Sequence, residues 1–174
     1  GTYARMRLYS AKIPKLAQEM VSALTEGKDI ETESPREVQL DIEAVLTQYA
    51  KDEQEVSDRA KEIVAQRGLP QSEFNRIKKL AADERKIKIG DDAIDYVLDQ
   101  LVEILMHSTN VDEIFSEDHV LRRKMREPLR KLAGQDDELQ SEVRAQLKHV
   151  KEGTTMWEVE YRRIMEDLKR RKGL

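Results

Sequence analysis

Apolar side chains recur every three or four positions along most of the chain, which is the spacing of helices that bury one face. A first series lies within residues 13–24, a longer one within 38–63 and a third within 74–80, and the pattern then restarts at residue 94. The restarted series contains Ile94, Val97, Leu101, Leu105, Leu121, Met125, Leu129, Leu132, Leu139, Val143, Val150, Trp157, Tyr161, Ile164 and Leu168. No segment shows the convincing alternation of a half-buried strand. The sequence therefore predicts an all-α fold.

Residues that start and stop helices divide these series into separate elements. Ser34, Pro35 and Glu37 form a capping box with proline at the first helical position, which predicts a helix that starts at residue 35. Thr155 and Glu158 repeat the capping spacing before the last apolar series. Glycines stand where helices are expected to end, at Gly27, Gly68 and Gly153.

The apolar pattern of the first part of the chain returns in the second. Residues 13–31 align with residues 94–112 without a gap, and their apolar positions coincide. With two residues inserted, the apolar positions of residues 42–56 fall on those of residues 125–139. Identity is low, so a shared helical period could produce part of this likeness. We interpret it as an internal duplication.

The alignment predicts two similar three-helix halves, residues 6–89 and 90–174, each with the order short, long, short. A kinked connection near Gly90 joins them, as one bent helical element or as a hinge. Pro128 lies inside the second long helix and predicts a kink, because proline removes a backbone hydrogen bond. The residues that precede Met6, 1–5, are interpreted as an expression scar or a disordered extension.

The long helices set the expected shape. A helix of about 32 residues is about 45–50 Å long, and a helix of about 15 residues covers only half of it. The remaining apolar face must be covered by the other short helix, the sister half or a second molecule. We therefore expect an elongated helical bundle or a dimer.

Composition narrows the class of protein. Charged residues make up 38% of the chain and the net charge is −4. Counted separately, neither half has the overall positive charge of a typical nucleic-acid binder. The absence of cysteine excludes disulfides, thiolate metal sites and cysteine nucleophiles. No apolar run approaches the roughly 18 residues that span a bilayer, and no signal peptide is apparent. A soluble cytoplasmic protein is the default expectation.

One stretch of the second half is strongly basic. Arg122, Arg126 and Arg130 are spaced at i, i+4 and i+8, so they line up along one side of a helix. Acids of another helix, or water, could meet them; alternatively they form a ridge for phosphates or an acidic protein surface. The basic run at the end of the chain invites the same two interpretations, since cations also favour the last turn of a helix. That run is Lys169, Arg170, Arg171 and Lys172.

Catalytic and metal chemistry have little support. The segment from His107 to His119 is rich in metal-ligand residue types, but its spacing matches no helical metal motif. We interpret it as an acidic, capped loop between helices. No nucleophile elbow, P-loop or dinucleotide fingerprint is present. We predict no enzyme activity, no catalytic, metal or cofactor-binding residues, no cofactor and no small-molecule substrate. The acidic residues of the segment are Asp112, Glu113, Glu117 and Asp118.

Several segments resemble a known bacterial family, domain of unknown function family 507. The resemblance covers residues 6–174, and it implies a helical bacterial protein. It brings no catalytic or binding residues. The segments that carry it are MRLYSAKIP from Met6, LDIEAVL from Leu40, EDHVLRRK from Glu117, WEVEYRRIME from Trp157 and the closing KRRKGL.

The leading hypothesis is a non-enzymatic helical interaction or scaffold protein that binds a protein partner or itself. It rests on the expectation that part of the apolar face of the long helices stays uncovered. The alternative is binding of structured RNA or DNA through Arg122, Arg126, Arg130 and the basic run at the end of the chain. A metal-dependent enzyme at residues 107–119 is the third and least favoured hypothesis. No membrane partner is predicted.

Overall fold

The computed structural model describes residues 11–173, so the interpretation of residues 1–5 lies outside the described part of the chain. The all-α prediction is confirmed. Both halves have the expected order of helix lengths, with 14, 32 and 12 residues in the first and 15, 29 and 17 in the second. The helices are α1 (Ile13–Glu26), α2 (Pro35–Gln66), α3 (Phe74–Arg85), α4 (Ala93–His107), α5 (Asp118–Gln146) and α6 (Thr155–Arg171). Two short strands, β1 (Ile30–Glu31) and β2 (Glu113–Ile114), and two single-turn 3₁₀ helices, Gln71–Glu73 and Gly90–Asp92, complete the described elements.

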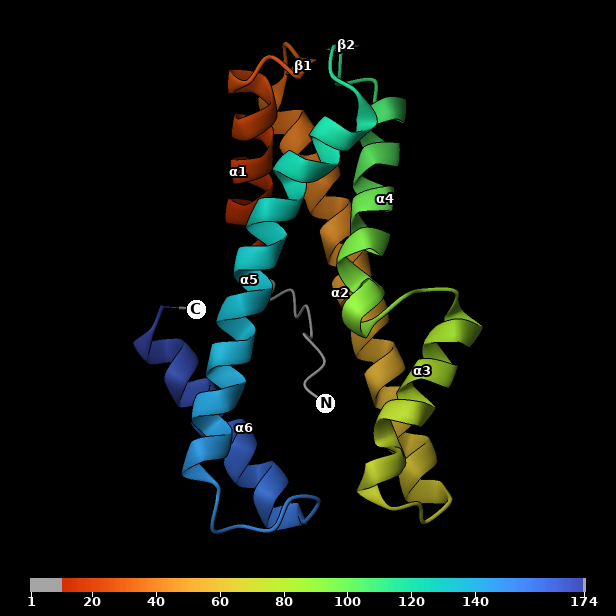
Figure 1. Cartoon of the computed structure of the whole chain (residues 1–174), viewed down its shortest axis with the longest axis vertical. Coiled ribbons are helices and arrows are strands. Elements are labelled where there is room, and N and C mark those ends of the chain that lie inside the picture. Colours follow the sequence, from red (N-terminus) through yellow and green to blue (C-terminus); the bar gives the residue numbers. More distant parts are fainter. Residues whose placement is uncertain (1–10, 174) are drawn as a thin grey trace.

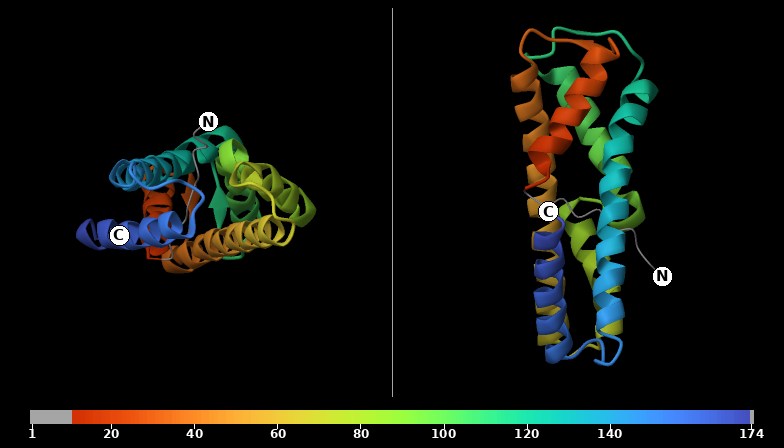
Figure 2. Two further views of the ribbon diagram at one scale, coloured as in Figure 1. Left: turned by 90° about the horizontal axis from the view of Figure 1, so that it is seen from below. Right: turned by 90° about the vertical axis from the view of Figure 1, so that its left-hand side faces the viewer.

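The molecule is elongated, and the long helices α2 and α5 run along its length (Figure 1; Figure 2). In the upper part of Figure 1, α1 packs against α2 and α5, and α4 packs against the same two helices. In the lower part, α3 packs along the end of α2, and α6 packs along the end of α5. The arrangement is a four-helix bundle extended by two helical hairpins.

The bundle has one hydrophobic core, built jointly by the two halves. Met20 and Leu24 of α1 and Leu101 of α4 are fully buried in it, as are Leu46 of α2 and Leu121 of α5. Because each long helix contacts the short first helix of both halves, the halves share their interior and are not separate domains in space.

The lower part of each long helix is covered by the last helix of its own half. Val64 of α2 packs with Phe74 and Ile77 of α3, and Val143 of α5 packs with Ile164 of α6. The expectation that part of the apolar face stays uncovered is therefore wrong for the described residues. The reason is that α3 and α6 cover only the ends of the long helices, while α1 and α4 cover the remainder from both sides.

The two strands join the halves at the upper end of the bundle. They pair antiparallel, with Ile30 opposite Ile114 and Glu31 opposite Glu113. When the starts of α2 and α5, residues 35 and 118, are matched, β1 corresponds to β2. Each strand thus pairs with its counterpart, as equivalent segments do across a twofold axis. The sequence did not predict these strands.

The connection between the halves is a bent linker and not a continuous helix. Lys86 ends α3 in the left-handed region, with φ of 62°, and the side chain of Ile87 turns back into the interior. Tyr49 of α2 holds the linker, since its hydroxyl donates a 2.9 Å hydrogen bond to the carbonyl of Lys88. Helix α5 runs unbroken through Pro128.

Two of the predicted helix starts need correction. Helix α2 begins at Pro35 as expected, but Ser34 makes no side-chain cap; its N–H donates to Thr32 Oγ1 instead. The cap of α6 is Thr154, whose Oγ1 accepts from the N–H of Trp157 at 3.2 Å, one residue before the predicted position.

Candidate functional site

The first arginine of the predicted basic ridge is held by two carboxylates. Nε of Arg122 lies 2.9 Å from Asp118 on its own helix, and Nη1 lies 2.5 Å from Asp99 on α4. The hydrogen bonds to Asp99 and Asp118 raise the pKa of Arg122 above its ordinary value. Its side chain is 27% exposed. The guanidinium thus bridges α4 and α5 and offers little free surface to a phosphate.

The remaining arginines of the ridge differ from each other. Nη2 of Arg126 lies 3.1 Å from Asp95, one turn before Asp99 on α4. Arg130 is exposed and forms no ion pair with a described residue. Carboxylates of α4 therefore form ion pairs with two of the three arginines. This agrees with the first of the two interpretations of this stretch.

The basic run at the end of the chain is also partly paired. Arg170 pairs with Asp167 on α6, and Nζ of Lys172 lies 2.9 Å from Glu142 of α5. Glu142 is 12 residues beyond Arg130, or about 18 Å along the helix. This ion pair therefore fixes the run against a part of α5 well beyond the arginine ridge. Arg171 is exposed and Lys169 is half-buried.

The acidic segment between His107 and His119 makes polar contacts that hold the loops at the upper end of the bundle. Asp112 accepts a 2.8 Å hydrogen bond from the N–H of Glu33, and Nδ1 of His119 lies 3.3 Å from Glu117. In the part of the chain that the structure describes, no group of three or more His, Cys, Asp or Glu residues could hold a metal ion. These contacts agree with an acidic loop between helices.

A buried carboxylate organises this end, and the sequence did not single it out. Asp29 is 4% exposed and accepts hydrogen bonds from Lys124 Nζ at 2.5 Å and Ser116 Oγ at 2.6 Å. Its carbonyl accepts a third, from the N–H of Phe115 at 2.8 Å. Burial alone would raise the pKa of Asp29, but the hydrogen bonds from Lys124 and Ser116 outweigh it and the pKa is lowered. The carboxylate therefore stays charged and ties the α1–α2 loop to α5.

A second polar network ties α2 to the loop after α4. Asp41 accepts hydrogen bonds from the hydroxyl of Ser108 and, at 3.0 Å, from the side-chain amide of Asn110. Thr32 Oγ1 donates to the carbonyl of Asn110 at 2.6 Å. Together with the Asp29 network, these bonds hold both loops and the strand pair in one rigid arrangement.

Large apolar side chains are exposed near both ends of the molecule. Met106 in the last turn of α4 and Phe115 directly after β2 are 57% and 63% exposed. Figure 1 shows β2 and the end of α4 at the upper end of the molecule. Met156 and Val159, 66% and 59% exposed, lie one turn apart in the first part of α6. The other exposed large apolar residues among those described are Leu40 and Leu80.

The aromatic residues of α6 lie at the border of its core. Trp157 stacks on Tyr161 with ring centroids 4.8 Å apart, and both pack against the cluster formed by α5 and α6. Trp157 is only partly buried. Trp157 therefore packs against the core as predicted, while the side of α6 that carries Met156 and Val159 faces solvent.

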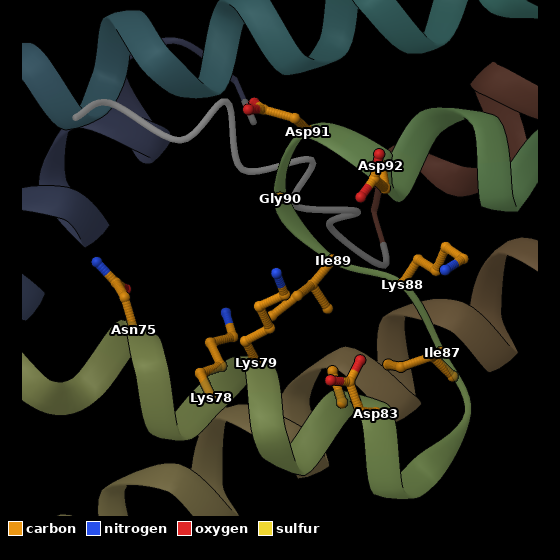
Figure 3. Close-up of a pocket in the computed structure, with 11 residues that line it drawn as sticks. Asn75, Lys78, Lys79, Asp83, Ile87, Lys88, Ile89, Gly90, Asp91 and Asp92 are labelled. Carbon is orange, nitrogen blue, oxygen red and sulfur yellow. The ribbon is translucent and has the colours of Figure 1, made fainter.

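A pocket of about 370 Å³ lies between α3 and the linker to α4 (Figure 3). Lys78 and Lys79 project from α3, and Asp91 and Asp92 stand across the pocket (Figure 3). Lys78 is tied to Glu53 of α2 by a 2.5 Å ion pair in which its side chain is only 6% exposed. Three lysines and three aspartates line the pocket, so the lining has no net charge that would select an anion or a cation.

Comparison with known proteins identifies the family but no relative of known activity. A family model described as "Protein of unknown function (DUF507)" matches residues 6–174. Because the match covers nearly the whole chain, the chain belongs to this family, and the resemblance found in the sequence is confirmed. No curated protein matches the chain. No helix of the described residues is long and apolar enough to cross a membrane.

Proposed function

We propose that this member of the DUF507 family is a non-enzymatic, cytoplasmic bacterial protein that binds a protein partner or a second copy of itself. The observation that carries the proposal is the exposure of Met156 and Val159 on a helix whose opposite face is already packed. Single exposed apolar residues are common on protein surfaces, whereas contiguous apolar patches mark sites where proteins contact each other. Methionine and aromatic side chains are enriched where proteins contact each other.

The position of this pair on α6 supports the proposal. The buried residues Ile164, Met165 and Leu168 face α5, and helical periodicity places Met156 and Val159 on the opposite side. These two residues therefore contribute nothing to the core of the described structure. A second protein would bury both of them.

The other half of the molecule carries a polar pair at the corresponding positions. When α2 and α5 are matched by their first residues, Met156 corresponds to Glu73 and Val159 to Arg76. Those two residues form a 2.5 Å ion pair on the surface. The apolar pair is thus particular to α6, while the same place on α3 carries a charged surface that needs no partner.

The test is sedimentation at micromolar concentration, combined with retention of bacterial proteins on the immobilised chain. The wild type should form a dimer or retain one stoichiometric protein. The variant M156E/V159E should lose that association, because two charges would be buried in the contact. The variant L40E/L80E, with the same change in charge at isolated exposed positions, should keep it. A monomeric wild type that retains no stoichiometric protein would refute the proposal.

Binding of structured RNA or DNA remains the second candidate, favoured by the exposure of Arg130 and Arg171 without ion pairs to described residues. It is weakened by Arg122 and Arg126, whose guanidiniums already contact carboxylates of α4. Fluorescence anisotropy of labelled RNA hairpins and duplex DNA at 50 and 200 mM salt decides between the two. We expect no binding at either concentration. Submicromolar binding that weakens at least 100-fold at the higher salt, and weakens further in R126A/R130A, would favour nucleic acid.

A further inference from the structure

Two glutamates face each other at the upper end of the bundle. The register of the strand pair puts Glu31 directly opposite Glu113, and side chains at opposite positions project from the same face with Cβ atoms about 4.5–5.5 Å apart. Ile30 is buried and Ile114 is half-buried against the bundle core, so the glutamates occupy the outward face. Like charges in this position destabilise a strand pair. The fold therefore carries an unfavourable interaction at its surface.

The glutamate pair has no cationic partner among the described residues. Neither glutamate forms an ion pair with a described residue, whereas Asp29 and Asp118 close by have Lys124 and Arg122 as partners. The Asp29 and Asp41 networks fix both loops, so the backbone positions that carry the two glutamates stay opposite each other. A cation supplied from outside the chain would contact both carboxylates at once.

An aromatic side chain adjoins the glutamate pair. Phe115 follows Glu113 by two residues, directly after the end of β2, and its side chain is 63% exposed. Its backbone is fixed by the hydrogen bond to the carbonyl of Asp29. An exposed ring on this fixed backbone, beside two carboxylates, offers contact to an apolar side chain and to the flat face of a guanidinium.

The surrounding residues make this end strongly acidic. The segments 26–37 and 106–119 contain nine acidic and two basic residues, a formal charge of −7, whereas the whole chain has −4. The rest of the protein is therefore net positive by three. Such a local field attracts basic partners and repels nucleic acid.

We propose that the strand end, defined as Glu31, Glu33, Glu113 and Phe115, is a docking surface for a basic segment of a partner protein. An arginine or lysine of that segment lies between Glu31 and Glu113, and a neighbouring apolar side chain packs on Phe115. Arginine fits best, because its five N–H donors can serve both carboxylates. The inference rests on the proposed function as a protein-binding protein and names the chemistry of the partner.

The test uses a labelled synthetic peptide of alternating arginine and leucine, with a glutamate–leucine peptide as the comparison. Fluorescence anisotropy of the full chain at 20 and 150 mM salt should show micromolar binding of the arginine peptide only, weaker at the higher salt. The variant E31Q/E113Q should bind the peptide at least tenfold more weakly, and F115A should also weaken it. The variant E138Q/E152Q, which loses the same two charges at exposed glutamates far from the strands, should change the affinity less than twofold.

Thermal melting separates this role from a structural one. Removal of two facing like charges should leave the melting temperature of E31Q/E113Q equal to or above that of the wild type, while binding is lost. The inference is overturned if the wild type does not prefer the arginine peptide, or if both double variants weaken binding equally. Sedimentation and retention with M156E/V159E judge the proposed function independently of the peptide result.

Discussion

At the scale of single residues, the pairing of Asp29 with Lys124 ties the α1–α2 loop to α5 at the upper end. The carboxylate is buried, while Lys124 reaches it from α5 and keeps 29% of its side chain in contact with solvent. An ionised group in such a place is stable only while its hydrogen-bond partners remain. The pair connects residues 95 positions apart, so it fixes tertiary structure rather than a local turn.

Replacing Lys124 with methionine should destabilise the protein by about 1–3 kcal/mol, because a buried acceptor loses its charged donor. Denaturant unfolding followed by circular dichroism measures the change. Lys131→Met removes an exposed lysine from the same helix and should change the stability by less than about 0.5 kcal/mol. Equal effects of the two substitutions would show that the ion pair contributes nothing particular.

The same pair predicts a pH dependence. The pKa of Asp29 is lower in the folded chain than in the unfolded chain, so its charge stabilises the fold above the unfolded value and this contribution is lost as the pH falls through the folded pKa. The stability advantage of the wild type over Asp29→Asn should therefore be full near neutral pH and shrink below about pH 4. Urea unfolding of both proteins at several pH values gives the difference directly.

At the scale of elements, helices with a regular apolar spacing could be predicted from the sequence. The short strands and the ion pairs between helices could not. The spacing of Val38, Ile42 and Leu46 predicts most of α2, and the structure buries all three. A two-residue strand is too short to show an alternating pattern, so β1 and β2 left no signal. Asp95 and Asp99, the acids that meet the arginines of α5, looked like ordinary surface residues, because only the packing of α4 on α5 brings them close.

The same limit applies to the ends of elements. A serine before a proline marks the start of α2 correctly, yet it does not say which side chain satisfies the free N–H groups. The cap depends on the backbone angles of Ser34, and these follow from the path of the preceding loop. Local sequence therefore locates a helix start better than it identifies the hydrogen bonds made there.

The linker between α3 and α4 offers a prediction for an element. Tyr49 is buried, and burial raises the pKa of its phenol well above the ordinary value, so the hydroxyl stays protonated and donates to the carbonyl of Lys88. Tyr49→Phe should cost about 1 kcal/mol of stability and leave that carbonyl without its donor. Tyr96, whose ring lies 5.9 Å from that of Tyr49, makes no hydroxyl hydrogen bond to a described residue. Tyr96→Phe should be close to neutral in the same unfolding measurement, and a loss as large as that of Tyr49→Phe would contradict this account.

At the scale of the whole molecule, the shared core makes the two halves one cooperative unit. Helix α1 contacts α5, and α4 contacts α2, so separation of the halves would expose the apolar faces of both long helices. This interlocking could not be predicted from the repeat in the sequence, because the alignment places residues within each half and says nothing of how the halves meet.

Residues 6–89 expressed alone should accordingly lack a cooperative melt, and so should residues 90–174. Mixing the two fragments should restore helical circular dichroism and a single transition, because each supplies the missing faces of the other. The intact chain serves as the reference for helix content. A fragment that melts cooperatively as a monomer would show that a half is an independent domain.

The pairing of β1 with its counterpart β2 has a consequence for any chain segment that docks there. Glu31 and Glu113 stand directly opposite each other in an antiparallel pair, so half a turn about an axis between them exchanges the two positions. A segment therefore meets nearly the same pair of carboxylates whether it runs in one chain direction or the opposite one. Phe115 breaks this equivalence, because no aromatic residue lies two positions from Glu31 on either side, where the chain has Asp29 and Glu33. The polarity of a bound segment would thus be decided by a single aromatic ring, which stands on one side of the glutamate pair and has no aromatic counterpart on the other.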